Sequence, residues 1–224
     1  MPEAETTEHS NDVGTKKKVP RRFLKEEGKL VDGRLKRLQA TFLNGQPRAR
    51  AQLAELRRGI SRTPGDLPEI WSLTDVPSDD LTGTTPTAKE WAVHITMCLY
   101  ALQQQGRNTP AHVPGLPFGQ AIRSLAGNDA EKSPIWRRFT AAMLAQDITG
   151  IRDHLQGIVG QMHSAKAYTP FDYAALADDL VALQYPQARS GVRLRWQRDF
   201  YSTPATPNDP DTTDNFETIT ETED

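Results

Sequence analysis

Apolar residues recur at helical spacing through most of this 224-residue chain, and that spacing constrains the fold more than any other feature. The clearest stripe comprises Trp91, Ile95, Cys98, Leu99 and Leu102, which share one side of a helix. The other side of the same segment is also apolar, so this helix is predicted to be buried on most faces. Strand signals are scarce, because no segment sustains an alternation of apolar and polar residues. The sequence therefore predicts an all-α fold.

Start signals place several of the other helices. Ser133 followed by Pro134 is typical of an N-cap with proline in the first helical turn, and Asp172 is a second candidate N-cap. The last helix is expected over about residues 188–201. These signals predict helices that begin near residues 134 and 173.

The first half of the chain is expected to be less regular. Residues 21–43 predict an amphipathic helix that is interrupted at Gly28 and Gly33, since glycine weakens a helix interior. A second helix is expected to run to the Arg58–Gly59 pair. Residues 63–86 are rich in Pro, Gly, Ser, Thr and Asp and predict a loop, which three apolar residues should fasten to the core: Ile70, Trp71 and Leu73.

The domain organisation follows from these segments and from the polar ends. Residues 1–19 and 202–224 offer little to bury and are predicted to be disordered tails. The remaining residues are enough for one helical bundle or for two small helical lobes. In the second arrangement the lobes would span residues 20–108 and 109–201.

The net charge of −2 conceals a strong segregation of charge. Residues 16–62 contain 15 bases against four acids, a net of +11, whereas the seven charged residues after Tyr201 are all acidic. Solvated surfaces usually interleave both signs, so this imbalance favours a polyanionic partner, nucleic acid above all. An acidic protein partner is the alternative.

The segment VRLRWQRDFY, residues 192–201, places three arginines around an aromatic stripe. Val192, Trp196 and Phe200 fall on one side of the predicted helix and should be buried. A guanidinium is a planar donor that matches phosphate oxygens, so the arginines are candidate phosphate contacts. Alternatively, they frame the buried stripe and pair with carboxylates of the same chain: Asp199, Asp178 or Asp179.

Catalytic and metal-binding patterns are missing from the sequence. The five histidines are scattered, the single cysteine lies in an apolar run, and no phosphate-binding loop follows a strand. The adjacent Asp178 and Asp179 point apart on a helix and are predicted to be solvated. The chain is therefore predicted not to be an enzyme, with no catalytic residue, no metal ligand and no cofactor.

The sequence also favours a cytoplasmic location. Its start is acidic and lacks the apolar core of a secretory signal, and its longest apolar run is too short to cross a bilayer. A single cysteine allows no intramolecular disulfide, which fits a reducing compartment.

Six blocks, taken in order, resemble the CasB family, the small subunit of the type I-E CRISPR surveillance complex called Cascade. The similarity covers roughly residues 21–201 and leaves out both tails. The blocks are RRF with the following RLKRLQATFL, ARAQLAELRRG, AVHITMCLYALQQQ, SPIWRRFTAAMLAQ with the following HLQGIVGQM, FDYAALADDLVALQ, and VRLRWQRDFY.

This resemblance implies a non-enzymatic, all-helical subunit that is present in two copies and packs head to tail along the complex. Its implied partners are the other Cascade subunits, a second copy of itself, the guide RNA, and the target and displaced DNA strands. Such a subunit would stabilise the R-loop through backbone contacts rather than by reading bases. The predicted nucleic-acid-binding residues are Arg34, Arg37, Arg50, Arg57, Arg58, Arg123, Arg137, Arg138, Arg193, Arg195 and Arg198.

Two other functions remain open from the residues alone. A sequence-specific DNA-binding regulator would use the turn before residues 188–201 and present that helix to the major groove. A purely structural adaptor would bind acidic proteins through the same basic residues.

Overall fold

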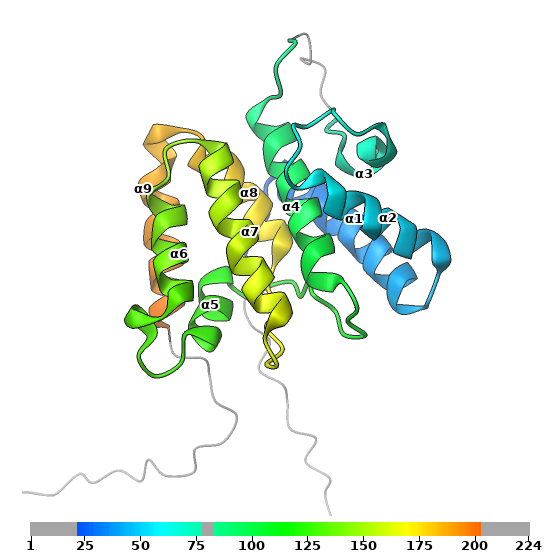
Figure 1. Ribbon diagram of the computed structural model, residues 1–224. Coiled ribbons are helices and arrows are strands. Elements are labelled where there is room, and N and C mark those ends of the chain that lie inside the picture. Colours follow the sequence, from blue (N-terminus) through cyan, green and yellow to red (C-terminus); the bar gives the residue numbers. More distant parts are fainter. Residues whose placement is uncertain (1–21, 78–82, 203–224) are drawn as a thin grey trace, which may run out of the picture.

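The computed structural model describes residues 22–77 and 83–202, whose helices pack side by side (Figure 1). The predicted all-α class is confirmed: among the described residues the only β feature is a bridge between His112 and Phe171. Residues 1–19 and all but the first residue of 202–224, the predicted tails, lie outside the described residues. The elements are α1 Glu26–Leu43, α2 Pro47–Gly59, a 3-10 turn Pro68–Ile70, α3 Trp71–Thr74, α4 Ala88–Gln104, α5 Phe118–Ala126, a 3-10 turn Ala130–Lys132, α6 Pro134–Leu144, α7 Ile148–Ser164, α8 Tyr173–Leu183 and α9 Pro186–Tyr201.

Helix α4 is the centre of the fold, as the continuous apolar stripe predicted. It packs against α1 and α2 on one side and against α7 and α8 on the other (Figure 1). Every residue from Ala92 to Ala101 is buried, including the polar His94 and Thr96. A capping box begins the helix, in which the Thr87 hydroxyl accepts from the Glu90 N–H at 3.2 Å and the Glu90 carboxylate accepts from the Thr87 N–H at 2.7 Å.

The predicted helix starts at Ser133 and Asp172 are confirmed. The Ser133 hydroxyl accepts a hydrogen bond from the Trp136 N–H at 3.2 Å, and the Asp172 carboxylate accepts one from the Ala175 N–H at 3.1 Å. Each side chain thereby satisfies a backbone donor that the helix itself cannot pair.

The predicted interruption of the first helix is wrong, because α1 runs from Glu26 to Leu43 without a break. Gly28 serves a close approach instead: a Cβ atom there would lie 2.7 Å from the Asp178 carboxylate. The Gly28 N–H donates to that carboxylate at 2.7 Å. Phe23, expected on the helix, precedes it and is 85% exposed.

The segment between α2 and α4, predicted to be a loop, contains the 3-10 turn Pro68–Ile70 and α3. It is only partly fastened to the core as predicted. Ile70 is buried and Leu73 is partly buried against the core, but Trp71 is 52% exposed. The prediction for Trp71 is therefore wrong. Its indole N–H instead donates to the Gly65 carbonyl at 2.9 Å, which closes the loop on itself.

Helix α9 is held by an aromatic cluster. Val192, Trp196 and Phe200 are each about 1% exposed, which confirms the predicted stripe. The rings of Trp196 and Phe200 stack on Phe139 of α6. On its other side α9 meets α5 at Gly119, where a Cβ atom would lie 2.5 Å from the Trp196 carbonyl oxygen.

The predicted division into two lobes at residue 108 stays a prediction. Buried side chains from before and after that residue form one continuous cluster, and α1 packs directly on α8. This shared core fixes the basic N-terminal helices rigidly to the second half of the chain.

Candidate nucleic-acid interface

Four of the predicted arginines are already engaged by groups of the same chain. Arg34 donates to the carbonyls of Leu73 and Asp75 at 3.2 and 2.6 Å and pairs with the Asp75 carboxylate. Arg123 donates to the Gly127 carbonyl at 2.7 Å and so caps its own helix. The other two form ion pairs, Arg58 with Glu55 and Arg195 with Asp179.

Four others are exposed and have no side-chain partner within the described part of the chain: Arg37, Arg50, Arg137 and Arg198. The remaining three also have no carboxylate partner among the described residues, but each is in contact with the body of the fold. Burial lowers the pKa of Arg57, Arg193 has a buried Nε without a partner, and Arg138 lies across α7 at Gly157, where any Cβ atom would collide with its guanidinium. The eleven residues therefore do not form a single equivalent set.

Asp179 explains why Arg195 is engaged. This carboxylate is 4% exposed and accepts hydrogen bonds from three donors: Arg22 Nη1 at 2.6 Å, Trp196 Nε1 at 2.7 Å, and Arg195. It therefore joins the segment before α1, helix α8 and helix α9. The alternative of an intramolecular ion pair is confirmed for Arg195.

The prediction that Asp178 and Asp179 are solvated is wrong. Asp178 is 1% exposed and accepts from the N–H groups of Lys25 and Gly28 at 2.8 and 2.7 Å, so it caps the start of α1 from another helix. The two carboxylates do point apart, but α8 is covered by α1 on one side and by α9 on the other. Burial raises the pKa of Asp178, partly offset by these hydrogen bonds.

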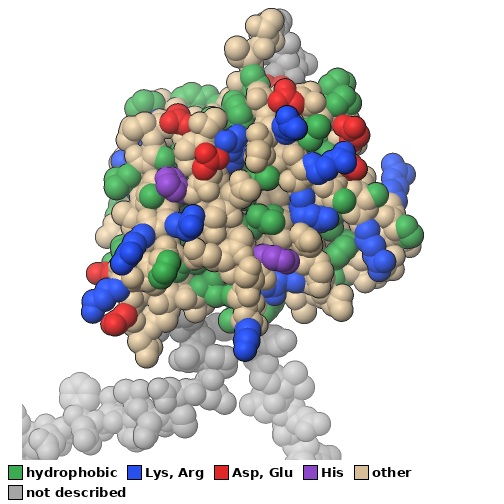
Figure 2. Space-filling model, viewed as in Figure 1, with side chains coloured by type: hydrophobic (Ala, Val, Ile, Leu, Met, Phe, Trp, Pro, Cys, Tyr) green, Lys and Arg blue, Asp and Glu red, His purple; other side chains and the backbone are tan. Residues whose placement is uncertain are grey.

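The densest group of available cations lies on and just after α2. We call residues 47–62 the α2 basic segment; its cations are Arg48, Arg50, Arg57, Arg58 and Arg62. Its single acid, Glu55, pairs with Arg58, and the described residues provide no acidic partner for the other four arginines. Figure 2 shows basic side chains gathered over the part of the surface where α2 lies in Figure 1.

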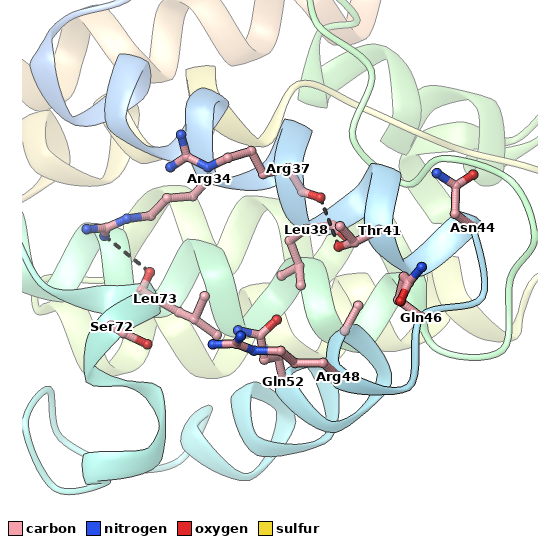
Figure 3. A pocket seen from close by; sticks show the side chains of 11 residues that line it. Arg34, Arg37, Leu38, Thr41, Asn44, Gln46, Arg48, Gln52, Ser72 and Leu73 are labelled. Carbon is pink, nitrogen blue, oxygen red and sulfur yellow. Dashed lines mark hydrogen bonds between the residues drawn. The ribbon is translucent and has the colours of Figure 1, made fainter.

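An open groove of about 500 Å³ separates α1 from α2, and we call it the α1–α2 groove (Figure 3). Arg34 and Arg37 come from α1 and Arg48 from the first turn of α2, whereas α3 supplies Ser72 and Leu73. Burial, with a smaller effect from the nearby Arg37 charge, lowers the pKa of Arg34. The remaining lining residues are Leu38, Thr41, Asn44, Gln46, Ala49 and Gln52.

Sequence reasoning missed Arg48, Arg62 and Arg22. Arg48 and Arg62 could have been found, since they belong to the same run of positive charge as Arg50 and Arg57. No sequence signal could have identified Arg22, because its partner Asp179 lies 157 residues away along the chain.

The described residues contain no group of three or more His, Cys, Asp or Glu side chains placed to hold a metal ion. Burial raises the pKa values of Cys98 and Tyr100 and lowers that of His94, which keeps these core side chains uncharged. Within the same residues, no helix combines the length and hydropathy that a membrane span requires.

The family described as CRISPR-associated protein Cse2 matches residues 52–201. The chain belongs to the Cse2 family of CRISPR-associated proteins. Cse2 is thus the family already indicated by the CasB resemblance, and the matched segment spans the second half of α2 and everything from there to the end of α9.

Two solved structures are similar to this Cse2-family chain. CasB from Thermobifida fusca is 29% identical, with a TM-score of 0.68 over 80% of this chain and 100% of that one. A CRISPR-associated protein of the Cse2 family from Thermus thermophilus is 27% identical, with a TM-score of 0.57 over 79% and 97% of the two chains. No curated protein sequence matches the chain.

Proposed function

We propose that this Cse2-family chain is a non-catalytic, nucleic-acid-binding subunit of a type I-E CRISPR Cascade complex. It stabilises the guide RNA and the R-loop DNA strands through a basic helical surface, in antiviral defence. Its partners are the other Cascade subunits, a second copy of the chain, the guide RNA, and the target and displaced DNA strands. A cytoplasmic location belongs to the same proposal.

The observation that carries this proposal is the α2 basic segment. Four of its five arginines have no acidic partner among the described residues. Arg48, Arg50 and Arg57 sit on α2, whose other side is buried at Leu53 and Leu56, and Arg62 follows just after the helix. Such cations need little reordering to contact phosphates, and they contact the backbone without reading base edges. In an R-loop, an RNA–DNA heteroduplex replaces a DNA duplex of similar stability. Contacts with the backbone can therefore shift the equilibrium from the closed duplex toward the open R-loop.

The predicted contacts differ in the support they receive. Arg37, Arg50, Arg137 and Arg198 are the stronger candidates, because they are exposed and have no side-chain partner among the described residues. Arg57, Arg138 and Arg193 also have no carboxylate partner there, but Arg57 and Arg193 are partly buried and Arg138 packs on α7. The engaged arginines would have to leave an intramolecular partner before they could bind a phosphate: Arg34, Arg58, Arg123 and Arg195.

Copurification tests the proposal. An affinity-tagged chain expressed in its native cells should recover other CRISPR-associated proteins together with a guide RNA, and nuclease treatment should remove the RNA. Recovery of the chain alone, or with acidic proteins and no RNA, would contradict it. A strong preference for one selected duplex over random duplexes would instead favour a sequence-specific regulator.

A further inference from the structure

The α1–α2 groove is electrically polarised along its length. In Figure 3, Arg34, Arg37 and Arg48 extend toward the end that α3 closes, while Asn44 and Gln46 lie at the turn between the two helices. None of the described residues that line the groove is acidic. A ligand that fits it would therefore place negative charge at the arginine end and hydrogen-bonding groups at the amide end.

The arginine end is a built feature rather than a chance gathering of surface charge. Arg34 is bound to the Leu73 carbonyl and to both the carbonyl and the carboxylate of Asp75, so it fixes the α3 segment as the third wall. Arg37 and Arg48 are exposed, and neither has an acidic partner in the described part of the chain. Two cations are thus left available on opposite walls of the groove.

The size and shape of the groove limit the class of ligand. Its volume of about 500 Å³ lies within the range of small-ligand pockets, about 300–1,000 Å³. It can take one nucleotide, whereas a double helix could only lie across its rim. Bases are accessible in single strands, where amide side chains can bind their edges and guanidinium planes can stack on them.

We propose that the α1–α2 groove binds one nucleotide of a single-stranded nucleic acid. Arg37 and Arg48 contact the phosphate, and the side-chain amides of Asn44 and Gln46, at the other end of the groove, face the base or the sugar. Arg34 is a positioning residue, which holds α3 in place. This inference rests on the proposed nucleic-acid-binding function and adds to it a defined subsite and a preference for unpaired strands.

The test compares variants of the full chain for binding to a short fluorescent single-stranded oligonucleotide and to the matching duplex, by anisotropy at several salt concentrations. Replacing both Arg37 and Arg48 by alanine should weaken single-strand binding at least tenfold. The slope of log binding constant against log salt concentration should become shallower by about 1.4, since each phosphate contact on a single strand contributes about 0.7. Duplex binding should fall less. The matched control replaces Lys132 and Lys166, two exposed lysines outside the predicted contacts, and removes the same charge.

A second variant separates the groove from general electrostatics. Gln52→Trp fills the groove without changing the charge and should also weaken single-strand binding while leaving duplex binding unchanged. Thr41→Trp, on the exposed side of α1, serves the same purpose if Gln52→Trp lowers the helicity.

The outcomes distinguish this inference from the proposed function. Equal losses for the groove pair and the lysine pair, with no effect of the tryptophan variant that folds, would overturn the groove as a nucleotide subsite while nucleic-acid binding stands. If the groove variants reduce binding of poly-glutamate but not of the oligonucleotide, the occupant is an acidic peptide and the inference is wrong. Both proposals fail if neither the unaltered chain nor an assembly that contains it binds single-stranded or duplex nucleic acid at low salt.

Discussion

Removing the charge of Asp179 is the sharpest test of how the fold fixes its arginines. The substitution Asp179→Asn keeps the size of the side chain and one acceptor oxygen. It removes the negative charge that Arg22 and Arg195 share, and it places an amide NH₂ where the carboxylate accepted from Trp196 Nε1 or from a guanidinium.

The expected cost follows from burial. Hydrogen bonds to charged groups contribute about 1.5–3 kcal/mol each, and a buried donor left without a partner costs about 1–3 kcal/mol. The Arg22 and Arg195 side chains are 29% and 36% exposed, so water can replace the lost hydrogen bonds and their contribution to the loss of stability is reduced. Trp196 is about 1% exposed, so water cannot reach its indole N–H. We expect Asp179→Asn to lower the free energy of unfolding by about 2–4 kcal/mol.

Urea denaturation followed by far-ultraviolet circular dichroism measures this loss through the transition midpoint and slope. The matched control is Asp153→Asn, whose carboxylate is 63% exposed and pairs with Arg152 at 2.8 Å. An exposed pair contributes less than about 1 kcal/mol, so the control should unfold close to the unaltered chain. A stability for Asp179→Asn within about 1 kcal/mol of the control would refute the role of Asp179 as the link between α8, α9 and Arg22.

Three further predictions concern helix packing, the pH dependence of stability, and the difference between a paired and an unpaired arginine. Gly119→Ala should destabilise the fold by about 1–3 kcal/mol or more, because the added Cβ meets the α9 backbone, whereas Gly160→Ala in open space should stabilise α7 by about 0.5–1 kcal/mol; thermal melts of both variants check this. Burial and the nearby Asp179 charge raise the pKa of Asp199, so its ionised form weakens the folded state at neutral pH. Asp199→Asn should therefore have a higher free energy of unfolding than the unaltered chain at pH 7. This difference in stability should shrink as the pH falls through the raised pKa of the folded state toward about 4. Urea melts in which the difference grows on acidification would contradict a destabilising charge at Asp199. Alanine at Arg195 should lower the unfolding midpoint, while alanine at Arg198 should not, so only the second is a clean probe of nucleic-acid binding in anisotropy titrations.

The helices could be predicted from the sequence because their signals are local. A period of 3.6 residues and a capping side chain act within a few turns, which is why the buried stripe of α4, the caps at Ser133 and Asp172, and the inward side of α9 agree with the structure. The same locality explains the error at Gly28. A glycine weakens a helix on its own, but here the contact with Asp178 of α8 decides its role.

By itself, then, the sequence determined the helical class, the segregation of charge and the family resemblance, because each depends on residue order alone. Only the tertiary structure decided which arginines are available. Arg195 and Arg37 look alike in sequence, yet a buried carboxylate from α8 engages the first, while the second lines the groove between α1 and α2. Charge pairing is a matter of distance in space, and the chain brings Asp179 to Arg22 across 157 residues through packing that no local pattern records.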